Sequence, residues 1–251
     1  MTHGIDISTF QGVIDFDKLA GKVDFVMIRA GYGQNNIDKY FKRNIEECNK
    51  RGIPCGVYWF SYALNENMAR NEARYCLEAV KPYRLEYPIA FDFEYDSVNY
   101  AARQGVTMTK ELASAICKAF CGEIEANKYY CLNYTNSDFL NRYFDADCNR
   151  RFAVWLAAWN NGSQPPRTCQ IWQYTNNFAV EGISGRVDAN RCYIDFPTVI
   201  KNAHLNHLDD PMYSEPIACA INSGIITPDE IEEKGAFAEM LYRYDKAVKH
   251  E

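Results

Sequence analysis

Short apolar segments recur through most of the chain, and each has about the length of a β-strand. They are rich in Val, Ile, Tyr, Phe and Trp, which is typical of strands. Helical spacing of apolar residues between the early segments predicts helices at 38–51, 66–80 and 109–127. The predicted strands are residues 3–8, 24–30, 53–60, 88–94, 129–134, 152–157, 169–174 and a shorter segment at 192–196.

This alternation of strand and helix predicts an α/β fold in which crossover helices join parallel strands. Eight such strands favour a closed, TIM-like (β/α) barrel. After Tyr134 the connecting segments shorten, so we expect an irregular barrel whose helices thin in its second half. The active site of such a barrel lies at the carboxyl ends of its strands, which makes acidic residues there candidates for catalysis.

The C-terminal part of the chain differs in composition from the rest. The polar stretch 203–215 predicts a linker between a barrel at 1–202 and a small helical appendage at 216–251. One predicted helix of this appendage has an apolar face formed by Phe237, Met240, Leu241 and Tyr244. The appendage is weakly similar to part of a surface-layer homology repeat, a wall-anchoring unit. We expect it to contact the cell wall, the barrel or a second copy of the chain.

Composition narrows the function classes. The 251 residues carry a net charge of −6 without a basic run, so nucleic acid is not an expected partner. No apolar run approaches membrane-spanning length, and no signal segment follows Met1, so we expect no membrane insertion. The ten cysteines form no CxxC pair, which favours reduced thiols in the core. No motif for a metal or another cofactor is present, so we expect none.

Two acidic residues lie two positions apart in the fourth apolar segment. Side chains at i and i+2 of a strand point to one face, so Asp92 and Glu94 share a face while Phe91 and Phe93 take the other. A rise of about 3.3 Å per residue separates the two carboxylates by roughly 6–7 Å. Paired carboxylates at such a separation are what hydrolysis of a glycosidic bond requires. An ion-paired or solvated edge strand is the alternative interpretation.

Further candidates come from distant parts of the sequence. Asp6 lies near the end of the first segment and Asp188 precedes the last, so we expect four carboxylates at one mouth of the barrel. A buried arginine usually pairs with a carboxylate, so we expect Arg29 to hold one of these aspartates. The candidate sugar-contacting aromatic residues, for which core packing is the alternative, are Tyr58, Phe60, Tyr62, Tyr134, Trp155 and Tyr174.

In order and spacing, these segments resemble the glycoside hydrolase family 25 lysozymes, or Chalaropsis-type muramidases. The similarity extends from about residue 4 to residue 199. It rests on Gly4-Ile-Asp-Ile-Ser8 with Gln11-Gly12, residues 24–32, residues 52–63, Pro88-Ile-Ala-Phe-Asp-Phe-Glu94, Trp172-Gln-Tyr174 and Val187-Asp-Ala-Asn190. The resemblance implies a flattened barrel and hydrolysis of the β-1,4 bond between N-acetylmuramic acid and N-acetylglucosamine in bacterial peptidoglycan.

The resemblance also implies roles for individual residues. Glu94 matches the general acid that protonates the departing oxygen. Asp92 matches a second essential carboxylate, which acts as nucleophile or orients the 2-acetamido group of the substrate. Asp6 and Asp188 match two supporting aspartates, and Tyr58 and Tyr134 match residues of the cleft. We expect the neighbouring negative charges to raise the pKa of Glu94, so that it keeps its proton.

Two other functions stay open. One is a non-catalytic peptidoglycan-binding module on the same scaffold, although the presence of all four carboxylates argues against it. The other is hydrolysis of another amino-sugar polymer such as chitin, although the Asp-Gly-x-Asp-x-Asp-x-Glu string of those barrels is absent. With no visible signal peptide, we expect synthesis in the cytoplasm and action on the wall after phage-type release or non-standard export.

Overall fold

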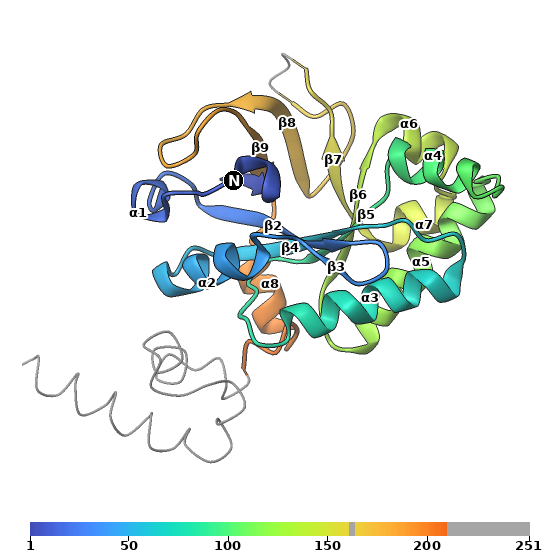
Figure 1. The fold of residues 1–251 in the computed structure, drawn as a ribbon, viewed down its shortest axis with the longest axis horizontal. Coiled ribbons are helices and arrows are strands. Elements are labelled where there is room, and N and C mark those ends of the chain that lie inside the picture. The colour runs from blue at the N-terminus through green and yellow to red at the C-terminus, as the bar shows by residue number, and fades with distance from the viewer. Residues whose placement is uncertain (161–163, 210–251) are drawn as a thin grey trace, which may run out of the picture.

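A closed eight-stranded barrel forms the core of the computed structural model, which describes residues 1–160 and 164–209 (Figure 1). Its strands, together with the short arm β3, are β1 (Thr2–Ile7), β2 (Phe25–Tyr32), β3 (Asn36–Ile37), β4 (Cys55–Phe60), β5 (Ile89–Asp92), β6 (Cys131–Asn136), β7 (Ala153–Ala157), β8 (Ile171–Phe178) and β9 (Val187–Cys192). The barrel order is β1-β9-β8-β7-β6-β5-β4-β2, and pairing of β1 with β2 closes it. The predicted TIM-like barrel is confirmed.

Helices lie mainly along the first half of the barrel, and they cover its outer face there. The helical elements are η1 (Thr9–Gln11), α1 (Phe16–Leu19), α2 (Phe41–Arg51), α3 (Glu66–Val80), α4 (Tyr95–Arg103), α5 (Lys110–Ala126), α6 (Ser137–Arg142), α7 (Ala146–Arg151) and α8 (Phe196–Asn202). Within the described residues, no helix connects β7 to β8 or β8 to β9. The helices therefore thin in the second half, as the shortening segments predicted.

The last strand departs from the prediction. We expected it at 192–196, whereas β9 spans Val187–Cys192 and runs antiparallel to both β8 and β1. Its apolar positions alternate with Asp188, Asn190 and Arg191, so it lacks the continuous apolar run that marks the other strands. One consequence is that Asp188 lies on the strand itself rather than before it.

The two faces of the barrel wall bury different groups. On the outside, Phe91 and Phe93 are fully covered, and the Phe91 ring lies 5.2 Å from Phe120 of α5. This arrangement confirms that the two phenylalanines take the face opposite Asp92. Inside the lower end, the rings of Phe25 and Tyr87 stack with centroids 4.4 Å apart. At the opposite end, where the parallel strands finish, polar and aromatic side chains line a pocket.

Glycine at position 4 makes room for this lower packing. A Cβ atom at Gly4 would lie 2.5 Å from the Phe25 ring, which is closer than real contacts permit. The absence of a side chain at Gly4 therefore lets the Phe25 ring of β2 fill the barrel interior next to β1. Asp6 follows Gly4 by two residues on β1, so it faces the same side of the strand. The Phe25 and Tyr87 rings fill the barrel interior at the end opposite the carboxylates.

The C-terminal end of the described chain closes the lower side of the barrel. Asn206 is fully buried, and its Nδ2 donates to the carbonyl oxygens of Leu85 and Tyr87 at 3.0 and 3.1 Å. Its Oδ1 accepts from the backbone NH of Tyr130 at 2.8 Å. The contacts of the barrel thus continue into the predicted linker. The expected appendage at 216–251 lies outside the described residues.

Two expectations from composition concern the same described residues. All nine cysteines in them are buried and unpaired, and the tenth, Cys219, lies outside them. None of the described helices combines the length and the apolar character that crossing a membrane requires.

Candidate active site

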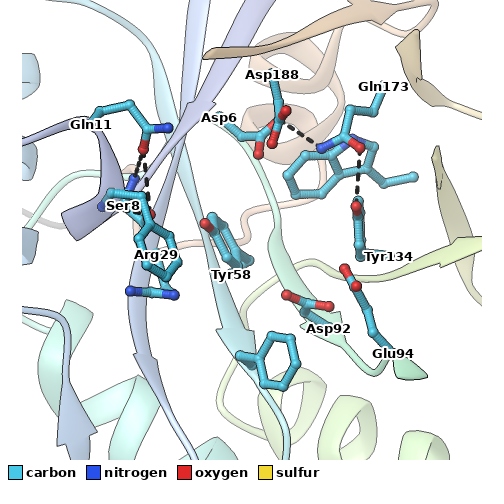
Figure 2. A pocket seen from close by; sticks show the side chains of 13 residues that line it. Asp6, Ser8, Gln11, Arg29, Tyr58, Asp92, Glu94, Tyr134, Gln173 and Asp188 are labelled. Atoms are coloured by element: carbon cyan, nitrogen blue, oxygen red, sulfur yellow. Dashed lines mark hydrogen bonds between the residues drawn. The ribbon is translucent and has the colours of Figure 1, made fainter. Parts of the chain in front are cut away.

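A pocket of about 190 Å³ opens at the carboxyl ends of the barrel strands (Figure 2). It brings together all four carboxylates that the sequence singled out, from β1, β5, the residue before α4, and β9. The lining residues are Asp6, Ser8, Phe10, Gln11, Arg29, Tyr58, Phe60, Asp92, Glu94, Tyr134, Trp155, Gln173 and Asp188.

Asp92 and Glu94 form the first acidic pair. Asp92 ends β5 and is 4% exposed, and its Oδ1 is buried without a hydrogen-bond partner among the described residues. Glu94 caps the start of α4, where its backbone NH donates to Ser97 Oγ at 3.1 Å, and its side chain is more open. Figure 2 shows both carboxyl groups directed toward the same space. The deeper carboxyl and the more accessible one are thus side by side.

Burial governs the protonation of this pair. It is the largest cause that raises the pKa of Glu94, and the charges of Asp96 and Asp188 raise it further. Burial also raises the pKa of Asp92 well above its usual range, with the charges of Glu94 and Asp6 adding to the effect. Because the charge of Glu94 raises the pKa of Asp92, the two carboxyls resist being ionised together. Charge crowding, the cause expected from sequence, is secondary to desolvation.

Asp6 and Asp188 form the second acidic pair. They are directly opposite each other in the antiparallel register of β1 and β9, so their side chains meet on the inner face. Burial and the charge of Asp188 raise the pKa of Asp6 to about 8. Asp6 Oδ2 accepts from Asn190 Nδ2 at 2.8 Å and from Gln173 Nε2 at 3.0 Å. Asp6 therefore favours its protonated form at neutral pH and accepts two hydrogen bonds at Oδ2.

Gln173 connects Asp6 to two aromatic side chains, Tyr134 and Trp159. Its Oε1 accepts from Tyr134 Oη at 3.0 Å and from Trp159 Nε1 at 2.9 Å, while its Nε2 donates to Asp6. Sequence reasoning missed this residue. The available signal was a polar side chain between Trp172 and Tyr174, because alternation along β8 turns position 173 inward when its neighbours face outward.

Four of the six candidate aromatic residues line the pocket: Tyr58, Phe60, Tyr134 and Trp155. Tyr62 lies beyond the end of β4, where its ring contacts Phe60 and Tyr100, and it is not part of the lining. Tyr174 faces outward, packs on Trp172 and lies under the Arg191 guanidinium at 4.7 Å. The structure thus assigns Tyr174 to outer packing, because the period of two in β8 places it opposite Gln173.

Arg29 does not hold any of the four pocket aspartates, contrary to expectation. Its Nε and Nη2 donate to Oδ2 of Asp38 at 2.8 and 2.7 Å, and Asp38 is 3% exposed. Asp38 follows β3, outside the apolar segments, and carried no sequence signal for this role. Arg29 still acts on the site at a distance, because its charge lowers the pKa of Asp92 against the larger effect of burial.

The donor set of the pocket favours acid chemistry on a polar ligand. Within the described residues, no group of three or more His, Cys, Asp or Glu side chains is placed to hold a metal ion. Carboxyl groups with raised pKa values beside aromatic faces can protonate a leaving oxygen while a neighbouring carboxylate stabilises positive charge. A barrel with such a mouth has the architecture of a glycoside hydrolase.

Comparison with known proteins gives the family. The model of "Glycosyl hydrolases family 25" matches residues 5–183, so the chain belongs to this family and is a glycoside hydrolase. YegX, an uncharacterized protein of Escherichia coli K12, is 24% identical over 197 residues, which cover 75% of this chain and 68% of YegX.

Solved structures share the fold. The modular autolysin LytC from Streptococcus pneumoniae is 32% identical with a TM-score of 0.65, over 75% of this chain and 46% of LytC. The CTP1L endolysin is 22% identical with a TM-score of 0.68, over 80% of this chain and 70% of the endolysin chain. Its identity is low enough that this likeness concerns the fold alone.

Proposed function

We propose that this enzyme is a lysozyme that hydrolyses the β-1,4 bond between N-acetylmuramic acid and N-acetylglucosamine in bacterial peptidoglycan. The observation that carries the proposal is the Asp92–Glu94 pair, in which two carboxyls of unequal exposure share a pocket with Tyr58 and Trp155. Membership of family 25 supports a peptidoglycan-hydrolysing glycosidase. LytC, which shares the fold, has been solved with a synthetic peptidoglycan ligand.

Glu94 is the general acid in this proposal. It is the more open of the two carboxyls, so a glycosidic oxygen can reach it, and its raised pKa keeps a proton available. As the bond breaks, the proton passes to the departing oxygen, and positive charge develops at the anomeric carbon. The resulting Glu94 carboxylate then serves as the base that deprotonates the attacking water.

Asp92 works from deeper in the pocket. The nearby Arg29 charge lowers the pKa of Asp92, and the positive charge that develops at the anomeric carbon also favours the ionised form of this carboxyl during the reaction. An ionised Asp92 either attacks the anomeric carbon directly or orients the 2-acetamido group to do so. A substrate that lacks the acetamido carbonyl distinguishes the two routes, because only direct attack survives its removal.

Asp6 and Asp188 support this pair without touching the departing oxygen. Asp6 accepts hydrogen bonds from Gln173 and Asn190, and Gln173 in turn accepts one from Tyr134, so Asp6 helps to position Tyr134. The Tyr134 hydroxyl donates its proton to Gln173 Oε1 and lies next to Glu94 (Figure 2). The second acidic pair is therefore connected to the general acid through two side chains.

The decisive test compares Glu94→Gln with wild type on purified peptidoglycan. Gln keeps the shape of Glu but carries no transferable proton, so we expect the rate to fall about 10²–10⁴-fold while the melting temperature stays near that of wild type. Mass spectrometry of wild-type products should show muramic acid at the new reducing ends. Glucosamine ends would favour the chitinase-like alternative, and wall binding without any products would favour a non-catalytic module.

The place of action follows from the substrate. The CTP1L endolysin shares the fold, and we propose a comparable use in which the enzyme meets the wall after release from the cell that made it. Wall fragments released by cells that express the gene, with and without membrane permeabilisation, provide the test.

A further inference from the structure

The pocket has one basic side chain among many acids. Of the residues that line it in the described part of the chain, Arg29 alone carries a positive charge, beside Asp6, Asp92, Glu94 and Asp188. An ionised carboxyl repels an anionic substituent on a sugar, whereas the arginine attracts it. The position of Arg29 therefore determines where such a substituent can lie.

Only part of the guanidinium is used within the protein. Nε and Nη2 both donate to Asp38 Oδ2, which also accepts from the backbone NH of Thr9 at 3.0 Å. The third nitrogen, Nη1, has no protein hydrogen bond to any described residue. Nη1 is not buried, so solvent reaches it. One arm of Arg29 is thus anchored, and one donor is open to a ligand.

Aromatic rings hold this donor in place. The guanidinium carbon lies 4.9 Å from the centroid of the Phe10 ring and 5.7 Å from that of Tyr32. Phe10 is 82% exposed, although it lines the pocket. An exposed ring beside a fixed cation offers an apolar face next to a hydrogen-bond donor. Figure 2 shows Arg29 on the Ser8 and Gln11 side of the pocket, with Tyr58 between it and Asp92.

We propose that Arg29 is a specificity-determining residue whose Nη1 binds an oxygen of the lactyl group of N-acetylmuramic acid. The inference rests on the proposed function, because the lactyl ether is the substituent that distinguishes muramic acid from glucosamine. Its carboxyl, free or joined to the peptide as an amide, offers only acceptor oxygens to this donor. The Phe10 face receives the lactyl methyl group. A chitin-type sugar has a hydroxyl in that position and leaves Nη1 unpaired.

The test measures binding in the Glu94→Gln background, where the ligand stays intact. Two disaccharides serve as probes: one of N-acetylglucosamine and N-acetylmuramic acid, and chitobiose, which lacks the lactyl group. We expect Glu94→Gln protein to prefer the muramoyl ligand by about 10- to 100-fold, the range of one charge-assisted hydrogen bond. Adding Arg29→Gln with Asp38→Asn should abolish this preference without changing the Kd for chitobiose. The paired change avoids leaving Asp38 buried without a cation.

Asp38→Asn alone is the matched control, since it keeps the Arg29 cation and should keep most of the preference. If the double substitution fails to fold, Arg29→Lys replaces it. An ammonium occupied by Asp38 has no second arm for the ligand, so the preference should fall at least threefold. An unchanged preference in either Arg29 variant, or an equal loss of affinity for both ligands, overturns the proposal.

The products of the wild-type enzyme test the proposed function independently of the role of Arg29. Muramic acid at the reducing ends, together with an unchanged preference in the Arg29 variants, would leave the lysozyme proposal intact and reject the role of Arg29. Glucosamine ends from wild type would reject the lysozyme proposal and, with it, this one.

Discussion

Replacing Asp6 with Asn should stabilise the protein at alkaline pH. The folded state holds a proton on Asp6, whose pKa is raised from 3.8 to about 8, while the unfolded chain releases it near its ordinary value. As pH rises above about 4, ionisation of this carboxyl stabilises the unfolded state but not the folded state, so the free energy of unfolding falls until the loss is complete above about pH 8. A gap of about four pKa units corresponds to a ceiling of about 6 kcal/mol at about 1.4 kcal/mol per unit.

Asn is a close mimic of the protonated aspartate. Its oxygen can accept from Gln173 and Asn190, as Asp6 Oδ2 does, and its NH₂ group can donate to Asp188 in place of the carboxyl proton. Asp6→Asn thus keeps the contacts and removes the titration. Urea unfolding at about pH 5 and about pH 8.5 should show wild type losing about 4 kcal/mol more than the variant between the two conditions.

A parallel pH dependence in the two proteins would refute this reasoning. It would show that Asp6 ionises in the folded state without cost, and hence that the pair with Asp188 does not share a proton. Asp24→Asn is a suitable comparison, because Asp24 accepts from the exposed backbone NH of His3 outside the pocket and has no such burial. That substitution should leave the difference between the two pH values unchanged.

Further predictions concern other buried groups. Burial raises the pKa of Glu72 from 4.5 to about 7, so the free energy of unfolding should fall as pH rises through this window. In urea unfolding, Glu72→Gln should reduce that pH-dependent loss by up to about 3 kcal/mol, and an unchanged loss would exclude Glu72 as its cause. Asn206→Ala leaves three buried backbone groups unpaired and should cost at least about 2 kcal/mol in the same assay. A chain ending at residue 202, which lacks Asn206, should therefore melt lower than one ending at residue 209. Wall hydrolysis should decline on the alkaline side as Glu94 loses its proton, and a rate that stays flat to about pH 9 would contradict its role as the acid.

The sequence was sufficient for the barrel because most of its strands are buried on both faces. Segments such as 53–60 and 88–94 are apolar runs bounded by turn residues, and they became β4 and β5 nearly as predicted. The strand β9 was placed wrongly because its inward positions, Asp188 and Asn190, are polar. A strand whose buried face serves the site does not have the composition of a core strand.

The pocket was predictable where spacing alone decides the geometry. Asp92 and Glu94 share a mouth because strand alternation fixes their side, and Asp6 was found from its place near the end of β1. The partners of polar side chains were not predictable. Arg29 binds Asp38, and Gln173 bridges Tyr134 to Asp6, through contacts that depend on how distant segments pack. Contacts between distant segments leave no periodic pattern in the sequence from which they could be predicted.

The antiparallel direction of β9 also determines where the chain leaves the barrel. Because β9 starts near the mouth, where Asp188 is its second residue, it ends at the opposite side of the barrel. There Asn206 hydrogen-bonds Tyr87 and Tyr130, which precede β5 and β6, and α8 lies at the same lower side (Figure 1). Thr2, at the start of β1, is on that same side, where its hydroxyl lies 3.3 Å from Tyr87 Oη. A parallel last strand would have led the chain back out at the catalytic rim. Reversing one strand thus places Thr2 and Asn206 together on the side of the barrel away from the pocket.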